Sequence, residues 1–145
     1  MSFLSALNIS GSALTAQKFR MDIISQNIAN STTTKTADGG PYKRRLVVLE
    51  EQKNASFKNV LADKLQNSIV GGVRVSEVIE DTTPFTAVYN PKHPDANEDG
   101  YVMMPNVNTT EEMLDLMSAS TAYDANITAL NALKAMATSA LNIGK

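Results

Sequence analysis

The last forty residues, Asn106–Lys145, read NVNTTEEMLDLMSASTAYDANITALNALKAMATSALNIGK, and this stretch decides the fold. It contains no proline and no glycine from Thr110 to Ile143, and alanine, the best helix former, recurs throughout. The spacing of Thr109 and Glu112 is that of a capping box, which predicts Thr109 as the N-cap of a helix. A helix that continues to Gly144 would be roughly 50 Å long.

Two rows of side chains along this helix repeat in alternating steps of three and four residues. The first seam contains Met113, Leu116, Ser120, Tyr123, Ile127, Leu130, Lys134, Ala137 and Leu141. The second seam contains Ala119, Ala122, Asn126, Ala129, Leu133, Met136, Ala140 and Ile143. A helix that is apolar on two sides usually has partners on two sides. We therefore expect the first seam to face a helix of the same chain and the second seam to face other molecules. The sequence leaves the reverse assignment open, and the presence of two seams is the firmer expectation.

A second long helix is predicted at the opposite end of the chain, over Met1–Asn30. Its apolar positions also step by three and four residues, which favours helix over strand. The seam contains Phe3, Leu7, Ser10, Leu14, Gln17, Met21, Ile24 and Ile28. Each of the two helices needs a partner, and the simplest partner is the other helix.

The centre of the chain follows strand rules instead. Turn residues fill 31–41, and short runs of β-formers after it predict four strands. These strands are Tyr42–Leu49, Val70–Glu80, Phe85–Tyr89 and Tyr101–Met104, whereas Glu50–Ser68 fits a helix or a loop equally well. The predicted fold class is α+β, with the long terminal helices paired as an α-helical coiled-coil hairpin and a small β-rich domain inserted between them. The expected boundaries are an N-terminal helix 1–30, a linker 31–41, the β-rich domain 42–108 and a C-terminal helix 109–145.

Composition excludes several classes of function. The 145 residues carry a net charge of −2, which argues against a nucleic-acid binder. The chain contains no cysteine, which excludes disulfides and cysteine-ligated zinc. We interpret the basic cluster Lys43–Arg45 as the solvated end of a strand. No apolar run approaches the ~20 residues that a membrane span needs, and the N-terminus lacks a cleaved signal peptide. The chain is thus expected in the cytoplasm unless it leaves by a route that reads no such signal.

No group of residues has the spacing of a catalytic or metal site. Asp95–Gly100 (DANEDG) resembles the first half of a calcium loop, but Asn106 stands where the bidentate glutamate would be. We expect a turn there. His93 is the only histidine, so neither a triad nor a zinc site can be built. We expect no enzyme activity, no catalytic residue, no cofactor and no metal.

One stretch resembles a known family. Asp22–Thr36 (DIISQNIANSTTTKT) is similar to the N-terminal signature of the bacterial flagellar axial proteins, the rod, hook and hook-associated subunits. Asn27, Ala29 and Asn30 fall on its most characteristic positions. Three further stretches resemble the proximal rod proteins of the basal body in particular: GGPYKRRLVVLEE, HPDANEDGYVMMPNVN and EEMLDLMSASTAYDANITALNALKAM.

The resemblance implies a structural subunit without enzyme activity or cofactor. In such proteins the terminal helices pair as a hairpin and stack with neighbouring subunits into a tube, with the β-rich domain outside. The implied partners are copies of the chain, the other proximal and distal rod proteins and, during secretion, the flagellar type III export apparatus, with no nucleic acid and no membrane insertion. The implied location is the basal-body rod, which crosses the periplasm or cell wall, reached without a cleaved signal peptide.

The residues that we expect at the assembly interface lie on both helices. They are Leu7, Leu14, Met21, Asn27, Ile28, Asn30, Met113, Leu116, Tyr123, Ile127, Leu130, Leu133 and Met136. We also expect the termini to be disordered before assembly, because so few charges leave the helices short of partners in a monomer. The alternative is a non-enzymatic binding module whose helices form a closed hairpin. Such a module would stay monomeric and would not need the second seam.

Overall fold

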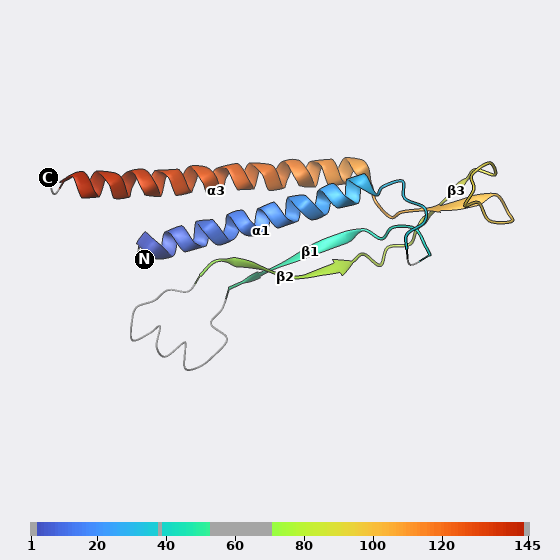
Figure 1. The fold of residues 1–145 in the computed structure, drawn as a ribbon, viewed down its shortest axis with the longest axis horizontal. Coiled ribbons are helices and arrows are strands. Elements are labelled where there is room, and N and C mark those ends of the chain that lie inside the picture. The colour runs from blue at the N-terminus through green and yellow to red at the C-terminus, as the bar shows by residue number, and fades with distance from the viewer. Residues whose placement is uncertain (1–2, 38, 53–70, 144–145) are drawn as a thin grey trace, which may run out of the picture. The chain divides into compact units, whose positions relative to one another are not determined.

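The computed structural model describes residues 3–37, 39–52 and 71–143 of the chain. Along the chain, a long helix comes first, a small β region follows, and a second long helix comes last (Figure 1). The elements are α1 (Phe3–Ala29), β1 (Arg45–Glu51), β2 (Val73–Glu80), β3 (Thr86–Tyr89), β4 (Tyr101–Met104) and α3 (Thr109–Ile143). The predicted α+β class, a helical hairpin with an inserted β region, is confirmed. The uncertain segment Glu50–Ser68 lies outside the described residues from residue 53 onward.

Helix α3 starts where the sequence places it, but a different residue caps it. Asn108 Oδ1 accepts a hydrogen bond from the Thr110 amide at 3.1 Å, and the Asn108 carbonyl accepts one from the Glu112 amide at 3.0 Å. Asn108 is therefore the N-cap, and the prediction of Thr109 is wrong by one residue. The side chain of Glu112 does not return to the cap, because it is buried in contact with α1 and Arg44.

Strands β1 and β2 form one two-stranded sheet. The pair is closed at one end by the Asp81 amide and Arg44 carbonyl, 2.8 Å apart, and at the other by the Gln52 amide and Gly72 carbonyl, 2.9 Å apart. The first strand begins three residues later than predicted. Tyr42 instead donates its amide to the Thr33 carbonyl at 3.1 Å, which ties it to the loop after α1.

Strands β3 and β4 form a second, antiparallel hairpin, with Thr86 opposite Met104 and Tyr89 opposite Tyr101. The expected turn precedes β4, where the Gly100 amide donates to the Asn97 carbonyl at 2.9 Å. Gly100 has φ +79°, and a Cβ there would lie 3.0 Å from the Tyr89 ring, so any other residue would be strained at this position. Asp95, the first acidic residue of the calcium-like sequence, accepts a hydrogen bond from the Thr34 hydroxyl at 2.7 Å.

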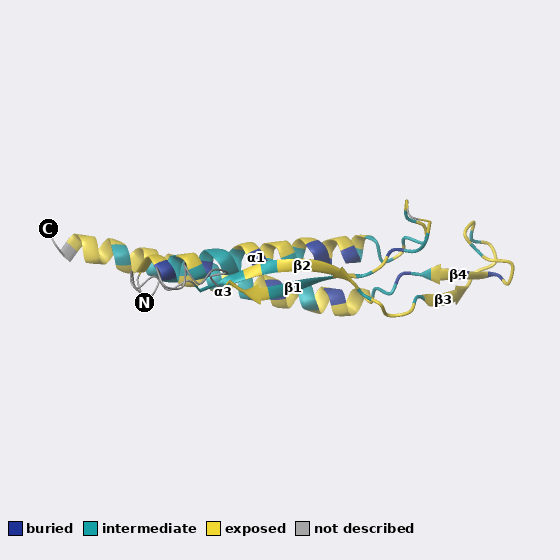
Figure 2. Cartoon of the chain, turned by 90° about the horizontal axis from the view of Figure 1, so that it is seen from below, coloured by how far each residue is buried: buried dark blue, intermediate teal, exposed yellow. Residues whose placement is uncertain are grey.

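The described residues belong to two compact units. Unit 1 comprises the described parts of Met1–Phe19, Leu49–Ser76 and Ala119–Lys145, and unit 2 comprises those of Arg20–Val48 and Glu77–Ser118. Within each unit, α1 lies beside α3 and beside the β1–β2 pair (Figure 1). The apolar core is small in both, and exposed surface follows much of each helix (Figure 2). Among the described residues, the buried apolar side chains are Ala16 and Ala119 in unit 1 and Ile23, Ile24, Tyr42 and Val102 in unit 2.

Candidate assembly interface

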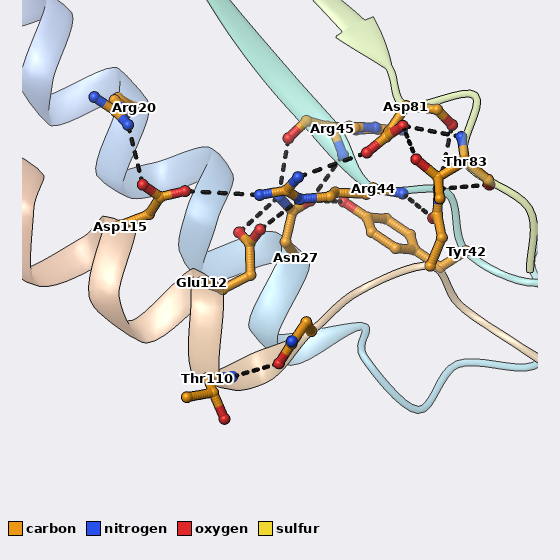
Figure 3. A network of polar contacts seen from close by, with 12 residues as sticks. Arg20, Asn27, Tyr42, Arg44, Arg45, Asp81, Thr83, Thr110, Glu112 and Asp115 are labelled. Carbon is orange, nitrogen blue, oxygen red and sulfur yellow. Dashed lines mark hydrogen bonds and ion pairs between the residues drawn. The ribbon is translucent and has the colours of Figure 1, made fainter. Parts of the chain in front are cut away.

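Asn27, near the end of α1 in unit 2, joins three segments of the chain. Its side chain is 1% exposed. The Nδ2 group donates to the Arg45 carbonyl and to Glu112 Oε2, both at 2.9 Å (Figure 3). The Oδ1 atom accepts from the Tyr42 hydroxyl at 2.9 Å and from the Arg45 amide at 3.0 Å. These four bonds use the whole capacity of an asparagine side chain, two donors and two lone pairs.

Arg44 and Glu112 form the charged part of the same network. Arg44 Nε donates to Glu112 Oε1 at 2.6 Å, and Glu112 is only 1% exposed. The guanidinium also lies 3.5 Å from Asp81 and 3.6 Å from Asp115 (Figure 3). Burial by itself would lower the pKa of Arg44, but the hydrogen bond and charge of Glu112, with a smaller effect of Asp81, raise it above its ordinary value. The interpretation of the basic cluster as a solvated strand end is therefore wrong for Arg44 and holds for Lys43, which makes an exposed pair with Glu80.

Asn106 and Asp81 extend the network into the loops that flank the β3–β4 hairpin. Asn106 Oδ1 accepts from the Arg44 amide at 2.8 Å, and its Nδ2 donates to the Thr83 carbonyl at 3.1 Å. Asp81 accepts from the amide and hydroxyl of Thr83, and these bonds, followed by Arg44, lower the pKa of Asp81.

We call this set the polar junction: Asn27, Tyr42, Arg44, Asp81, Asn106, Glu112 and Asp115. All of its members belong to unit 2. Their polar groups are paired with one another, an arrangement that positions α1, β1 and α3. Among the described residues, no three acidic or histidine side chains gather in a way that could hold a metal ion.

The predicted interface residues occupy different environments. Asn27 is inside the chain. Most of the others are half-buried: Leu7, Leu14, Met21, Ile28, Asn30, Leu116, Tyr123, Ile127, Leu130 and Leu133. Met113 and Met136 are 58% and 59% exposed.

The face that α3 turns toward its own chain lies between the two predicted seams. Ala119, which the sequence assigned to contacts with other molecules, is 1% exposed within this chain. Met113, which was expected to face the helix of the same chain, is exposed instead. For these two residues the expected assignment is wrong, and the reverse assignment, which the sequence left open, fits. The in-chain face takes Leu116 and Tyr123 from the first seam and Ala119 and Ala122 from the second.

Several large apolar side chains of α3 remain at the surface. Met113, Leu114 and Met117 are 58%, 62% and 66% exposed and lie together in unit 2. In unit 1, Met136 and Leu141 are 59% and 77% exposed. No helix within the described ranges combines the length and the apolar character needed to cross a membrane.

Comparison with known proteins gives the same family from both ends of the chain. Residues 7–35 match the model of the flagella basal body rod proteins, and residues 98–143 match that of the flagellar basal body rod FlgEFG protein C-terminal region. The flagellar basal-body rod protein FlgC of Bacillus subtilis is 45% identical, and the alignment covers 100% of both chains. FlgC of Borreliella burgdorferi is 44% identical over 99% of this chain and 98% of its own, and FlgC of Escherichia coli is 40% identical over 100% of both. The resemblance found in the sequence is confirmed: the chain belongs to the FlgC family of flagellar basal-body rod proteins, structural components of the bacterial flagellum.

Proposed function

We propose that this chain builds its part of the rod by packing its two long helices against helices of neighbouring rod subunits, including copies of itself. The observation that carries the proposal is the exposed apolar cluster Met113, Leu114 and Met117 on α3. Helices that face water usually carry charges on the exposed side. After Asp115, the described part of α3 carries only Asp124 and Lys134.

The energetics favour a buried position for this cluster. Covering one Leu or Met side chain contributes about 1.5–3 kcal/mol of favourable free energy. The described part of the monomer buries only six apolar side chains, so this part has little core to offset the exposed ones. Association with other helices supplies the missing contacts.

The polar junction has a positioning role in this proposal. It fixes α1, β1 and α3 through paired groups, and we assign no catalytic residue, cofactor or metal to it. The junction keeps the exposed face of α3 available to neighbours. This role explains why buried charges are placed at the start of α3, where the β region joins the helices.

We further propose that the subunit reaches the rod through the flagellar export apparatus and resides where the rod crosses the periplasm or cell wall. The small apolar core supports passage in an unfolded state, since few buried side chains must be exposed to unfold the chain. The other proximal and distal rod proteins are the remaining proposed partners.

The double variant Leu114→Lys, Met117→Lys tests the proposal in a strain that lacks the chromosomal gene. Both side chains are exposed, so we expect the monomer to lose less than about 0.5 kcal/mol per substitution. We expect few complete basal bodies in electron micrographs and loss of swimming. Thr32→Lys with Thr82→Lys, at two exposed loop positions, is the matched control with the same two added charges. Normal rods in the double variant would overturn the proposal.

A further inference from the structure

The outward stripe of α3 in unit 1 carries a single charge. Its members step by three and four residues and are all exposed: Thr121, Asp124, Thr128, Asn131, Ala135 and Thr138. The Thr128 hydroxyl donates to the Asp124 carbonyl and the Thr138 hydroxyl to the Lys134 carbonyl, both at 2.9 Å. These two hydroxyl protons are satisfied by their own helix, so another surface can cover them without leaving them unpaired. Asp124, whose carboxylate makes no ion pair with any described residue, is the one member that needs a charged partner.

A complementary stripe runs along α1 in the same unit. Leu4, Gly11 and Lys18 are spaced by seven residues and so lie on one side of the helix. Leu4 is 68% exposed, and the exposed ammonium group of Lys18 has no ion partner among the described residues. Asp22 follows one turn later, yet these two described side chains form no ion pair.

Among the described residues, no side chain and no other segment packs where a side chain at Gly11 would lie. A Cβ at this position would have no atom within 4 Å, although glycine inside a helix is less stable than alanine. Glycine at such a position allows another backbone to approach closely. Gly11 lies two turns from Lys18, on the same stripe.

We propose that the outward stripe of α1 in one copy packs on the outward stripe of α3 in the next copy, and that Lys18 pairs there with Asp124. The contact rests on the function proposed above and names one of its interfaces. A lone charge covered by an apolar neighbour loses its water without compensation, whereas opposite charges on the two stripes compensate each other. Charge complementarity thus identifies a second copy of this chain as the occupant.

The two stripes are different surfaces, so the contact is heterologous. In each contact one copy uses its α1 stripe and keeps its α3 stripe free, and the other copy does the reverse, so each can bind a further copy. Such a contact continues around a ring or along a helix and does not stop at a dimer. This property suits a subunit of a tube.

The absence of cysteine from the chain permits a direct test by crosslinking. We expect the variant Lys18→Cys, Asp124→Cys to give disulfide-linked multiples of the chain mass when purified basal bodies are mildly oxidised. The control, Lys18→Cys with Asn142→Cys, moves the second cysteine about 27 Å along the same exposed side of α3. A ladder of multiples in neither variant, or an equal ladder in both, overturns the contact.

Charge reversal keeps the test decisive if the cysteine variants fail to assemble. We expect Asp124→Lys to lower the number of basal bodies about tenfold, and addition of Lys18→Glu to restore it to within about twofold. Restoration by Lys134→Glu in place of Lys18→Glu, restoration by neither, or no effect of Asp124→Lys would each overturn the pairing. Normal assembly of Asp124→Lys beside failed assembly of the Leu114, Met117 variant would remove this contact and leave the proposed function intact.

Discussion

Replacement of Glu112 by glutamine keeps the size of the side chain and removes its negative charge from the polar junction. Glu112 accepts one bond from Arg44 at 2.6 Å and one from Asn27 at 2.9 Å. A glutamine oxygen can keep only one of them. If that oxygen keeps its bond to Arg44, the new amide N–H group of the glutamine faces the Nδ2 donor of Asn27. The Asn27 amide cannot flip to offer its oxygen instead, because Oδ1 already accepts hydrogen bonds from Tyr42 and Arg45.

The loss can be estimated from these bonds. A hydrogen bond to a charged group contributes about 1.5–3 kcal/mol and a neutral one about 0.5–1.5 kcal/mol. Removing one partner of a fully buried ion pair costs about 3–5 kcal/mol, but the side chain of Arg44 is 20% exposed and keeps Asp81 and Asp115 nearby. We therefore expect Glu112→Gln to lower the free energy of unfolding by about 2–3 kcal/mol. In a chain of this length that corresponds to a fall in Tm of about 5–10 °C.

Thermal unfolding of the full-length monomer, followed by tyrosine fluorescence and circular dichroism, measures this effect. Glu111→Gln is the matched control, because Glu111 is the exposed neighbour in the same first turn and should lose only a helix-dipole interaction of about 0.3–1 kcal/mol. Equal Tm values for the two variants would refute the assignment of Glu112 as a stabilising element of the junction.

Three further outcomes are expected. In dilute monomer we expect helicity well below one half of all residues, since Ala16 and Ala119 are the only buried apolar side chains in the described part of unit 1. Circular dichroism near one half would contradict this. Gly72→Ala should lower the free energy of unfolding, measured in urea, by about 1–3 kcal/mol, because Gly72 has φ +135° and an added Cβ would lie 2.5 Å from Ser12 Oγ. The control Gly71→Ala should change the free energy of unfolding by less than about 0.5 kcal/mol. The lowered pKa of Asp81 means that its stabilisation is present above the ordinary carboxyl pKa and is lost as the pH falls through the lowered value. Asp81→Asn should therefore flatten the loss of stability below about pH 4, and an unchanged pH profile would argue against the role of its bonds to Thr83.

The elements of the fold could be predicted because their signals are local. The three–four periodicity and the lack of proline fixed both helices to within a few residues of the observed ends. Strand Tyr101–Met104 was predicted with its observed bounds, since Gly100 and the turn before it mark its start. These signals come from residues within one turn or one strand of each other.

The polar junction could not be predicted in the same way. Arg44 and Glu112 are 68 positions apart in the sequence. Each also has a local interpretation: Arg44 belongs to a basic cluster at the end of a strand, and Glu112 has the spacing of a capping box. One signal was available for Glu112: it lies seven residues before Ala119, so the second seam extended by one heptad reaches it. A glutamate on an apolar seam indicates a buried partner, and Arg44 is that partner. Asn27 was singled out by the family resemblance, which says nothing of the bonds that it makes inside the chain.

The hydrogen bonds of Asn27 also affect how accurately the subunit folds before it joins the rod. Its four hydrogen bonds go to the backbone of Arg45, the Tyr42 hydroxyl and the Glu112 side chain, so all four form only when the strand and both helices are correctly placed. If α3 closes one turn out of register, an amide N–H stays unpaired in a dry site, at a penalty of about 1–3 kcal/mol. Correctly closed subunits then outnumber such errors by roughly 5- to 150-fold. A rod built from such subunits incorporates fewer misfolded copies, and it needs no separate factor to remove them.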